Sequence, residues 1–246
     1  MRPRTDAPHR AAGAGALAQG GGHGAQGPGR TRPGRAHPDV TARWPADPSH
    51  IAQAAERLRA GAVIAFPTDT LYAVAARAAD PAAVARLYAV KQRSSGQPMI
   101  WLVLDQPQVE RFAVVTAVAA ELMARFWPGP LTLVLPARIP AGGPTIAVRA
   151  PDHDVALALL RALGEPIASS SANPAGQPPP VDADQVIAGL GDRLDVVLDG
   201  GPCRIGQPST ILDLSGPTPR ILREGAIPTE ALIFPSPSGR GQGGGR

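Results

Sequence analysis

Short apolar runs alternate along the chain with segments whose apolar residues recur at helical spacing. Val84, Leu87 and Tyr88 follow the i, i+3, i+4 pattern of one helix face, and an Asp-Pro pair typical of a helix start precedes them. A compact apolar run such as Ala62–Phe66 instead predicts a short buried strand. This alternation of strands and helices favours an α/β fold.

The same patterns give the bounds of the predicted elements. The predicted helices are one capped by Ser49 that ends at Arg59 before Gly61, and Asp80–Lys91, Val118–Phe126, Asp154–Leu163 and Asp182–Leu190. The predicted strands are Ala62–Phe66, Met99–Leu104, Leu131–Leu135, Thr145–Arg149, a short one at Ile167, Val196–Leu198, Ile211–Leu214 and Arg220–Leu222. The last connection is too short for a parallel crossover, so we expect a mixed sheet.

Polar side chains gather where several of these strands end. They occur in GAVIAFPTDTLY (61–72), TIAVRAPD (145–152) and PIASSSANPAG (166–176), and Ser209-Thr210 adds a hydroxyl pair where a strand begins. In α/β sheets ligands bind in crevices outside the carboxyl ends of strands. The sequence therefore predicts a binding site built from these clusters.

The two ends of the chain differ in composition from the middle. Residues 1–43 contain nine Gly, five Pro and seven Arg with almost no large apolar side chains, and residues 236–246 are also rich in Gly. Such segments cannot bury enough apolar surface to offset their ordering entropy. We predict disordered extensions at 1–43 and 236–246 around one domain at 44–235. A start codon placed too far upstream would explain residues 1–43 equally well, whereas an organellar transit peptide fits less well because this segment lacks Ser.

Charge is distributed unevenly along the chain. The formal net charge is +4 and the sequence pI about 10.1. Residues 1–43 carry +5 and residues 236–246 carry +2, so the middle carries −3. A basic surface for nucleic acid is therefore not indicated for the domain, and any positive site must be local.

Composition also excludes several classes of site. The single Cys203 rules out an intrachain disulfide, and two of the five His, His50 and His153, fall within the domain, so we expect no metal site. We interpret His153 as structural and assign Cys203 no role. Because no apolar run approaches about 18 residues, we expect a soluble, cytoplasmic protein.

Six motifs together carry a family resemblance. They are PTDT followed by Tyr72, KxR at 91–93, VRAPD at 148–152, SSAN at 170–173, STILD at 209–213 and LREG at 222–225. In this order and spacing they resemble the YrdC-like family of threonylcarbamoyl-AMP synthases, in its short, single-domain type, over roughly residues 49–233. The resemblance implies a twisted mixed sheet flanked by helices, with one deep concave cavity.

The resemblance also implies a reaction. L-threonine, bicarbonate and ATP would give threonylcarbamoyl-AMP and pyrophosphate, for N6-threonylcarbamoyladenosine at position 37 of tRNA. Such chemistry needs positioning and charge neutralisation more than a covalent nucleophile, and the sequence offers cations and hydroxyls at loop ends. Mg²⁺ would accompany ATP, tRNA would be contacted weakly, and a downstream threonylcarbamoyl transferase would take the product.

By resemblance, individual residues receive roles. Lys91 and Arg93 would be catalytic and stabilise the phosphates. The residues implied for L-threonine are Thr70, Arg149, Ser169 and Ser209. Those implied for ATP are Lys91, Arg93, Gln97, Thr145, Ser171, Asn173 and Arg223.

Each of these residues also has a purely structural interpretation. Lys91 and Arg93 can be solvated cations at a helix carboxyl end, the hydroxyls can cap turns or strand ends, and Asn173 can form a turn before a proline. Whether Asp69 and Tyr72 touch substrate or only shape their loop stays open.

The chain departs from the family pattern at two places. The usual Tyr-Gly-Leu is Tyr72-Ala73-Val74, and Gln97 stands where Asn is common. Neither change removes a charged group, so we expect altered kinetics at most.

Two other functions compete with synthesis. A noncatalytic RNA-binding or ribosome-maturation module of the same fold is opposed by the acidic middle of the chain. A carbamoyl-transfer domain like that of hydrogenase maturation proteins normally lies beside zinc-finger and acylphosphatase segments, which this sequence lacks.

Overall fold

The computed structural model describes residues 41–94, 97–138 and 143–232. The strands in these ranges are β1 (Ala42–Pro45), β2 (Ile64–Pro67), β3 (Tyr72–Arg77), β4 (Ile100–Leu102), β5 (Leu131–Pro136), β6 (Thr145–Arg149), β7 (Ile167–Ser171), β8 (Val196–Asp199), β9 (Thr210–Asp213) and β10 (Arg220–Arg223). The helices are α1 (Pro48–Arg59), α2 (Pro81–Lys91), α3 (Gln106–Glu110), α4 (Ala117–Phe126), α5 (Asp154–Leu163) and α6 (Ala183–Leu190), with 3₁₀ turns at Gly191–Arg193 and Thr229–Leu232.

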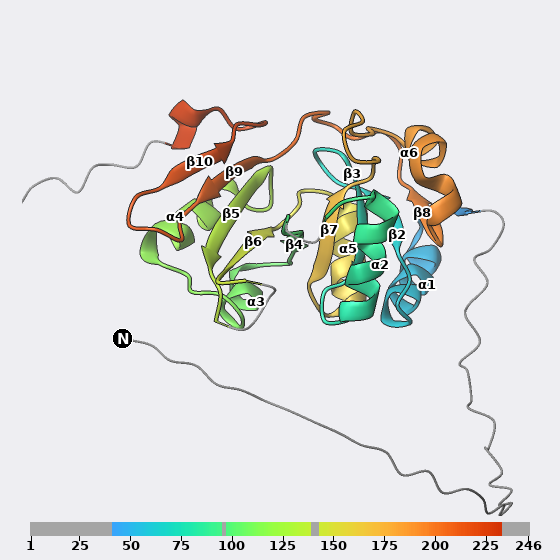
Figure 1. The fold of residues 1–246 in the computed structure, drawn as a ribbon, viewed down its shortest axis with the longest axis horizontal. Helices are drawn as coiled ribbons and strands as arrows, with labels where there is room; N and C mark the ends of the chain where they lie inside the picture. Colours follow the sequence, from blue (N-terminus) through green and yellow to red (C-terminus); the bar gives the residue numbers. More distant parts are fainter. Residues whose placement is uncertain (1–40, 95–96, 139–142, 233–246) are drawn as a thin grey trace, which may run out of the picture. The chain divides into compact units, whose positions relative to one another are not determined.

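All of these strands join one twisted sheet in the order β1-β8-β2-β3-β7-β4-β6-β5-β9-β10 (Figure 1). Strand β8 runs parallel to β1 and β2, whereas β3 runs antiparallel to β2 and β7. The hairpin of β9 and β10 is antiparallel, as the short connection predicts. The predicted α/β fold with a mixed sheet flanked by helices is confirmed.

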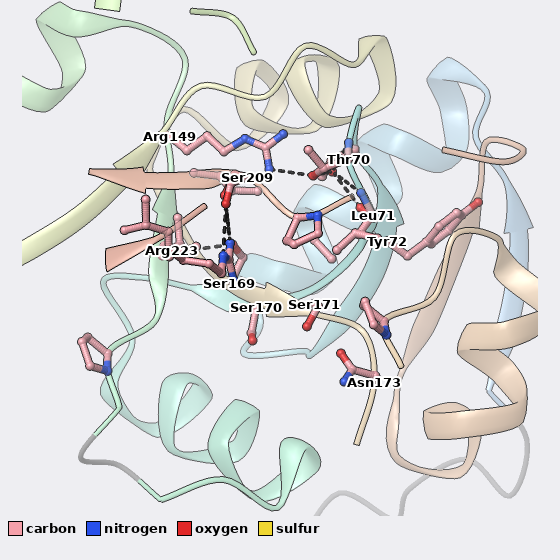
Figure 2. A pocket seen from close by; sticks show the side chains of 18 of the residues that line it. Thr70, Leu71, Tyr72, Arg149, Ser169, Ser170, Ser171, Asn173, Ser209 and Arg223 are labelled. Carbon is pink, nitrogen blue, oxygen red and sulfur yellow. Dashed lines mark hydrogen bonds between the residues drawn. The ribbon is translucent and has the colours of Figure 1, made fainter. Parts of the chain in front are cut away.

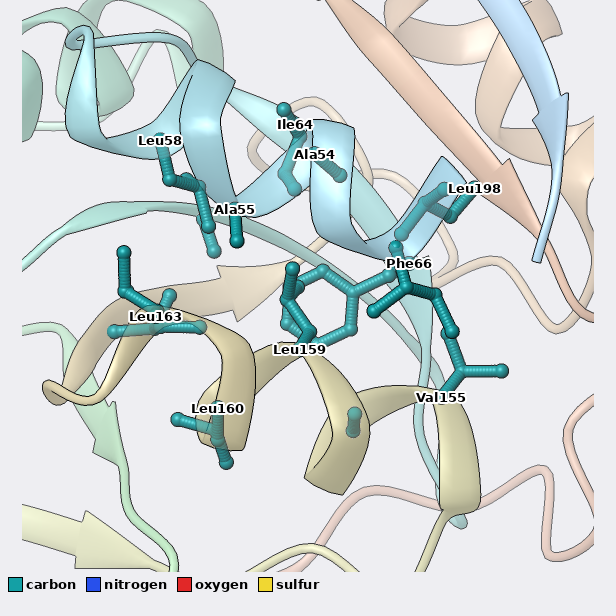
Figure 3. Packing of buried hydrophobic residues seen from close by; sticks show 14 of the residues in the cluster. Ala54, Ala55, Leu58, Ile64, Phe66, Val155, Leu159, Leu160, Leu163 and Leu198 are labelled. Atoms are coloured by element: carbon teal, nitrogen blue, oxygen red, sulfur yellow. The ribbon is translucent and has the colours of Figure 1, made fainter. Parts of the chain in front are cut away.

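Alternating side chains of β2 connect the sheet to helices on both faces. Ile64 and Phe66 pack in a cluster with α1 and α5, whereas Ala65 packs in a cluster with α2 and α6. Figure 3 shows Ala55 and Leu58 of α1 facing the apolar side chains of α5. A third cluster joins α4 to β5, β6 and β9. Burial on both faces explains why β2 is a continuous apolar run.

Helix α1 begins two residues earlier than predicted. Asp47, not Ser49, is its N-cap, because the Asp47 side chain accepts a hydrogen bond from the backbone N–H of His50 at 2.9 Å and Pro48 occupies the first turn. Gly61 follows the helix with a φ of +84°, which agrees with its predicted role as the stop. The caps Asp80 and Asp182 lie at the predicted helix starts.

The predicted amino-terminal boundary needs correction. Strand β1 begins at Ala42, inside the segment expected to be disordered, and pairs in parallel with β8. Arg43 forms ion pairs at 2.7 Å with Asp184 and Asp199, which fixes this strand to the sheet edge. The rest of the predicted extensions, residues 1–40 and 236–246, lies outside the described residues. None of the helices in the described ranges is long and apolar enough to cross a membrane.

Candidate functional site

A pocket of about 290 Å³ lies where the predicted polar clusters meet (Figure 2). Eight of the predicted site residues line it: Thr70, Arg93, Arg149, Ser169, Ser171, Asn173, Ser209 and Arg223. They come from β6, β7 and β10 and from the loops next to β3, α2 and β9. The structure therefore brings together side chains that are up to 153 positions apart in the sequence. The single deep cavity implied by the resemblance stays a prediction.

The Thr68–Thr70 segment forms a tight, buried turn after β2. The Thr68 hydroxyl accepts from the backbone N–H of Thr70 and Leu71, both at 3.2 Å, and donates to the carbonyl of Leu71 at 2.7 Å. The carbonyl groups of Asp69 and Thr70 accept from the backbone of residues 205–206. These bonds satisfy backbone groups of a segment whose residues are at most 2% exposed.

Arg149 enters the pocket from the end of β6 and is held on three sides. Its Nε donates to the carbonyl of Gly129 at 3.0 Å, its Nη1 donates to the Thr70 hydroxyl at 2.8 Å, and its Nη2 pairs with Asp69. Burial lowers the pKa of Arg149 from its usual value, and the charge of Asp69 opposes that shift. Asp69 thus orients Arg149, and it is not among the residues that line the pocket.

The serines that follow Ile167 belong to strand β7, which is longer than predicted. Ser169 donates to the carbonyl of Ile100 at 3.1 Å, and the Ser170 hydroxyl accepts from Arg93 at 3.3 Å. Ser170 lines the pocket as well but was not among the predicted site residues. Its position inside the SSAN motif was the only signal that could have identified it.

Lys91 and Arg93 leave the end of α2 in different environments. Gln92 between them has a φ of +51°, so the chain turns sharply at the helix end. Arg93 reaches the pocket and also donates through Nε to the side chain of Gln97 at 2.7 Å. Lys91 is 3% exposed and donates to oxygens of Ser171 and Asn173. Neither Lys91 nor Gln97 lines the pocket.

Ser209 and Arg223 are neighbours in the pocket lining. Arg223 donates through Nη2 to the carbonyl of Ser209 at 2.8 Å and to its hydroxyl at 3.2 Å, as Figure 2 shows. The Ser209 hydroxyl also contacts the hydroxyl of Thr132 at 2.8 Å. Burial lowers the pKa of Arg223.

Thr145 lies away from this pocket. It begins β6, whereas Arg149, at the other end of the same strand, lines the pocket. A rise of about 3.3 Å per residue separates these two ends by about 13 Å. Only the carboxyl end of the strand reaches the site, and a nucleotide contact of Thr145 stays a prediction.

Three guanidinium groups line the pocket, those of Arg93, Arg149 and Arg223, and no carboxylate of the described residues does. Asp69 balances Arg149, so an excess of positive charge remains. The described residues contain no group of three or more His, Cys, Asp or Glu side chains that could hold a metal ion. The electrostatics of the pocket favour an anionic ligand.

His153 and Cys203, for which no role in the site is predicted, have contacts that explain them structurally. The Nδ1 of His153 accepts from the backbone N–H of Val155 at 3.3 Å and caps α5. Burial lowers the pKa of His153, which suits a neutral acceptor. Burial raises the pKa of Cys203 to about 11, so its thiol is a poor nucleophile at neutral pH. Tyr72, whose role was left open, lines the pocket, and its hydroxyl donates to the carbonyl of Gly201 at 2.8 Å.

Comparison with known proteins agrees with the fold and the motifs. The Sua5/YciO/YrdC family model, described as "Telomere recombination", matches residues 56–225. The threonylcarbamoyl-AMP synthase of Bacillus subtilis (strain 168) is 43% identical over 202 residues, which cover 79% of this chain and 58% of that protein.

Two solved structures are similar as well. Pyrococcus abyssi Sua5 complexed with L-threonine superposes with a TM-score of 0.72 at 39% identity, over 78% of this chain and 58% of that one. Escherichia coli YciO superposes with a TM-score of 0.69 at 30% identity, over 78% of this chain and 98% of that one. The chain thus spans a little more than half the length of the synthase relatives named here. On the family model and these identities, the chain belongs to the Sua5/YciO/YrdC family.

Proposed function

We propose that this chain is an L-threonylcarbamoyladenylate synthase, which makes threonylcarbamoyl-AMP and pyrophosphate from L-threonine, bicarbonate and ATP. The observation that carries the proposal is the pocket in which Arg93, Arg149 and Arg223 meet a set of hydroxyl groups. It is supported by relatives named threonylcarbamoyl-AMP synthase and by a similar structure that contains L-threonine.

The reaction would proceed in two steps. The threonine amine attacks the carbon of bicarbonate, and loss of water leaves a carbamate on the nitrogen. A carbamate oxygen then attacks the α-phosphorus of ATP, and the bond to the β-phosphate oxygen breaks to release pyrophosphate. Both steps need oriented reactants and neutralised charge, which fixed guanidinium groups supply.

The cations of the pocket suit the two substrates. We assign the threonine carboxylate to Arg149, with Thr70, Ser169 and Ser209 near it, because Arg149 is the most firmly oriented cation. We assign the phosphates to Arg93 and Arg223, together with Ser171 and Asn173 of the same pocket lining. Mg²⁺ would enter as the counter-ion of ATP.

The proposed product fits a place in tRNA modification. It would be consumed by a threonylcarbamoyl transferase that forms N6-threonylcarbamoyladenosine at position 37 of tRNA, in the cytoplasm where tRNA and ATP meet. A direct contact with tRNA would be weak, because the middle of the chain is acidic. The alternative, a noncatalytic RNA-binding module, predicts tight RNA retention in filter binding at physiological salt.

A pyrophosphate-release assay with single omissions tests the proposal. Release should require ATP, threonine and bicarbonate together. Arg93→Ala should lower the rate by about 10² to 10³, the usual cost of losing one charge-stabilising donor. Release that is indifferent to threonine would contradict the proposed function.

A further inference from the structure

The side chain of Lys91 uses its donors inside the protein. Its Nζ lies within hydrogen-bond distance of the backbone carbonyls of Ser171 and Asn173, and at 3.3 Å from the side-chain oxygen Oδ1 of Asn173. An ammonium group has three N–H donors. In this arrangement all three point to protein oxygens, and Lys91 is not among the residues that line the pocket.

The backbone of Lys91 holds the same segment from a second side. Its carbonyl accepts from the backbone N–H of Ala175 at 3.2 Å. This carbonyl is available because α2 ends at Lys91 and Gln92 adopts the left-handed conformation. Side chain and backbone of one residue thus fasten residues 171–175, which we call the clasped segment.

The clasped segment forms part of the pocket wall. Ser171 and Asn173 both line the pocket. The side-chain amide of Asn173 donates to the carbonyls of Pro174 at 3.0 Å and Gln177 at 2.6 Å, while its oxygen accepts from Lys91. The orientation of Asn173 therefore depends on a hydrogen-bond network in which Lys91 supplies the only cation among the described residues.

We propose that Lys91 is a positioning residue that fixes the pocket wall at Ser171 and Asn173, and that Arg93 is the cation of the KxR motif that meets the ligand. Only the identity of that ligand as ATP rests on the proposed function. The two cations of the KxR motif thus differ in their surroundings. Lys91 is buried against carbonyl oxygens, and Arg93 lines the pocket.

Hydrogen exchange of the ligand-free full chain tests the positioning role without any assay of activity. Lys91→Met removes the donors but keeps a long side chain. It should speed exchange of the Ala172 and Ala175 amides, which donate to Tyr72 and Lys91, by about tenfold or more. Arg93→Met, the matched control, should leave both amides unchanged. Amides in the β5–β6 pair report on global unfolding, and in both variants they should change far less than Ala172 and Ala175 change in Lys91→Met.

A charge-preserving variant separates positioning from direct phosphate contact. Lys91→Arg keeps the positive charge, but its larger fork does not fit a side chain that is 3% exposed between three oxygens. It should therefore speed exchange at Ala172 and Ala175 and lower kcat/KM for ATP to within about threefold of Lys91→Met. In an Asn173→Ala background, the factor by which Lys91→Met lowers kcat/KM for ATP should be about tenfold smaller, because both changes disturb one network.

Three results would overturn the proposal. Unchanged exchange of the clasped segment in Lys91→Met would show that Lys91 does not hold it. An equal increase in the β5–β6 amides would show that Lys91 acts on the whole fold. Activity near wild type in Lys91→Arg, together with a loss in Lys91→Met, would show that its charge acts on the phosphates directly. The exchange results decide the matter even if the protein releases no pyrophosphate.

Discussion

The three guanidinium groups of the pocket differ in how firmly the protein orients them. Arg149 is buried and has contacts with Gly129, Thr70 and Asp69, whereas Arg93 is partly exposed and contacts Ser170 and Gln97. A fixed fork selects a planar carboxylate by its geometry, whereas a more exposed one can follow phosphates as they move. Arg149 therefore marks a rigid side of the pocket, and Arg93 marks an adaptable side.

Arg149→Lys tests the rigid side. Lysine keeps the charge but loses the fork, so the KM for threonine should rise more than the KM for ATP, by about tenfold, the effect of losing a hydrogen bond to a charged group. Initial rates with each substrate varied in turn give both constants. Equal increases would place Arg149 in the nucleotide site, and a collapse of the melting temperature would place it in the scaffold.

The titration of Lys91 gives a second prediction for a single residue. Burial, together with neighbouring Arg93, lowers the pKa of Lys91 from 10.5 to about 8 in the folded protein. Between those values the unfolded chain binds more protons, so the free energy of unfolding rises with pH in this window. Urea unfolding gives the free energy of unfolding of wild type and of Lys91→Met. The difference between them, wild type minus variant, should therefore grow from about pH 8 to about pH 10. A difference that is flat or falls would show that the pKa is not lowered.

At the scale of elements, sequence patterns found what has strong local signals. The caps Asp80 and Asp182 marked α2 and α6, and Arg149 was conspicuous at the end of an apolar strand. Strand β3 was missed because its alanines have low strand propensity and its burial depends on neighbours distant in the sequence. The contacts of Lys91 could not be predicted either, since they depend on a left-handed turn at Gln92.

The backbone that follows β10 determines where Arg223 lies. Two residues after Arg223, a side chain at Gly225 would place its Cβ 2.2 Å from the carbonyl oxygen of Pro208 and 2.6 Å from the backbone of Ser209. Thr210 also fixes this approach, because its hydroxyl accepts a hydrogen bond from the N–H of Gly225 at 3.0 Å. This close approach of two backbones positions Arg223 on Ser209.

Gly225→Ala should therefore destabilise the protein by about 1 to 3 kcal/mol, the usual cost of overpacking. It should also raise the KM for ATP, because Arg223 would move. Gly216→Ala is the control, since an added Cβ there meets nothing within 4 Å, and we expect a change within about 0.5 kcal/mol. Urea unfolding and initial rates measure both effects. Equal stability of the two variants would refute the backbone argument.

At the scale of the whole molecule, every motif that carries chemistry falls inside the described ranges. Residues 1–40 carry a net charge of +4 and residues 236–246 carry +2, which exceeds the net charge of the chain. Non-specific RNA affinity follows the number of cations that neutralise phosphates. We therefore expect catalysis to depend on the described ranges, and any weak, salt-sensitive RNA binding to depend on residues 1–40 and 236–246.

A pair of truncations tests this separation. Residues 41–235 should keep kcat, KM and melting temperature within error and lose salt-sensitive RNA binding. Residues 46–235 lack β1 and its ion pairs from Arg43, so they should melt at a lower temperature. Thermal melts, initial rates and filter binding at two salt concentrations provide the comparison. Loss of catalysis in residues 41–235 would mean that one of the removed segments completes the site.

The central claim is the reaction itself, and mass spectrometry of its product tests it most directly. Purified protein would be incubated with ATP, L-threonine and ¹³C-labelled bicarbonate, and the mixture analysed at once. The account predicts threonylcarbamoyl-AMP that carries the label in its carbamoyl group, formed only when all three substrates are present. Absence of this product from folded protein that binds both ATP and threonine would contradict the account.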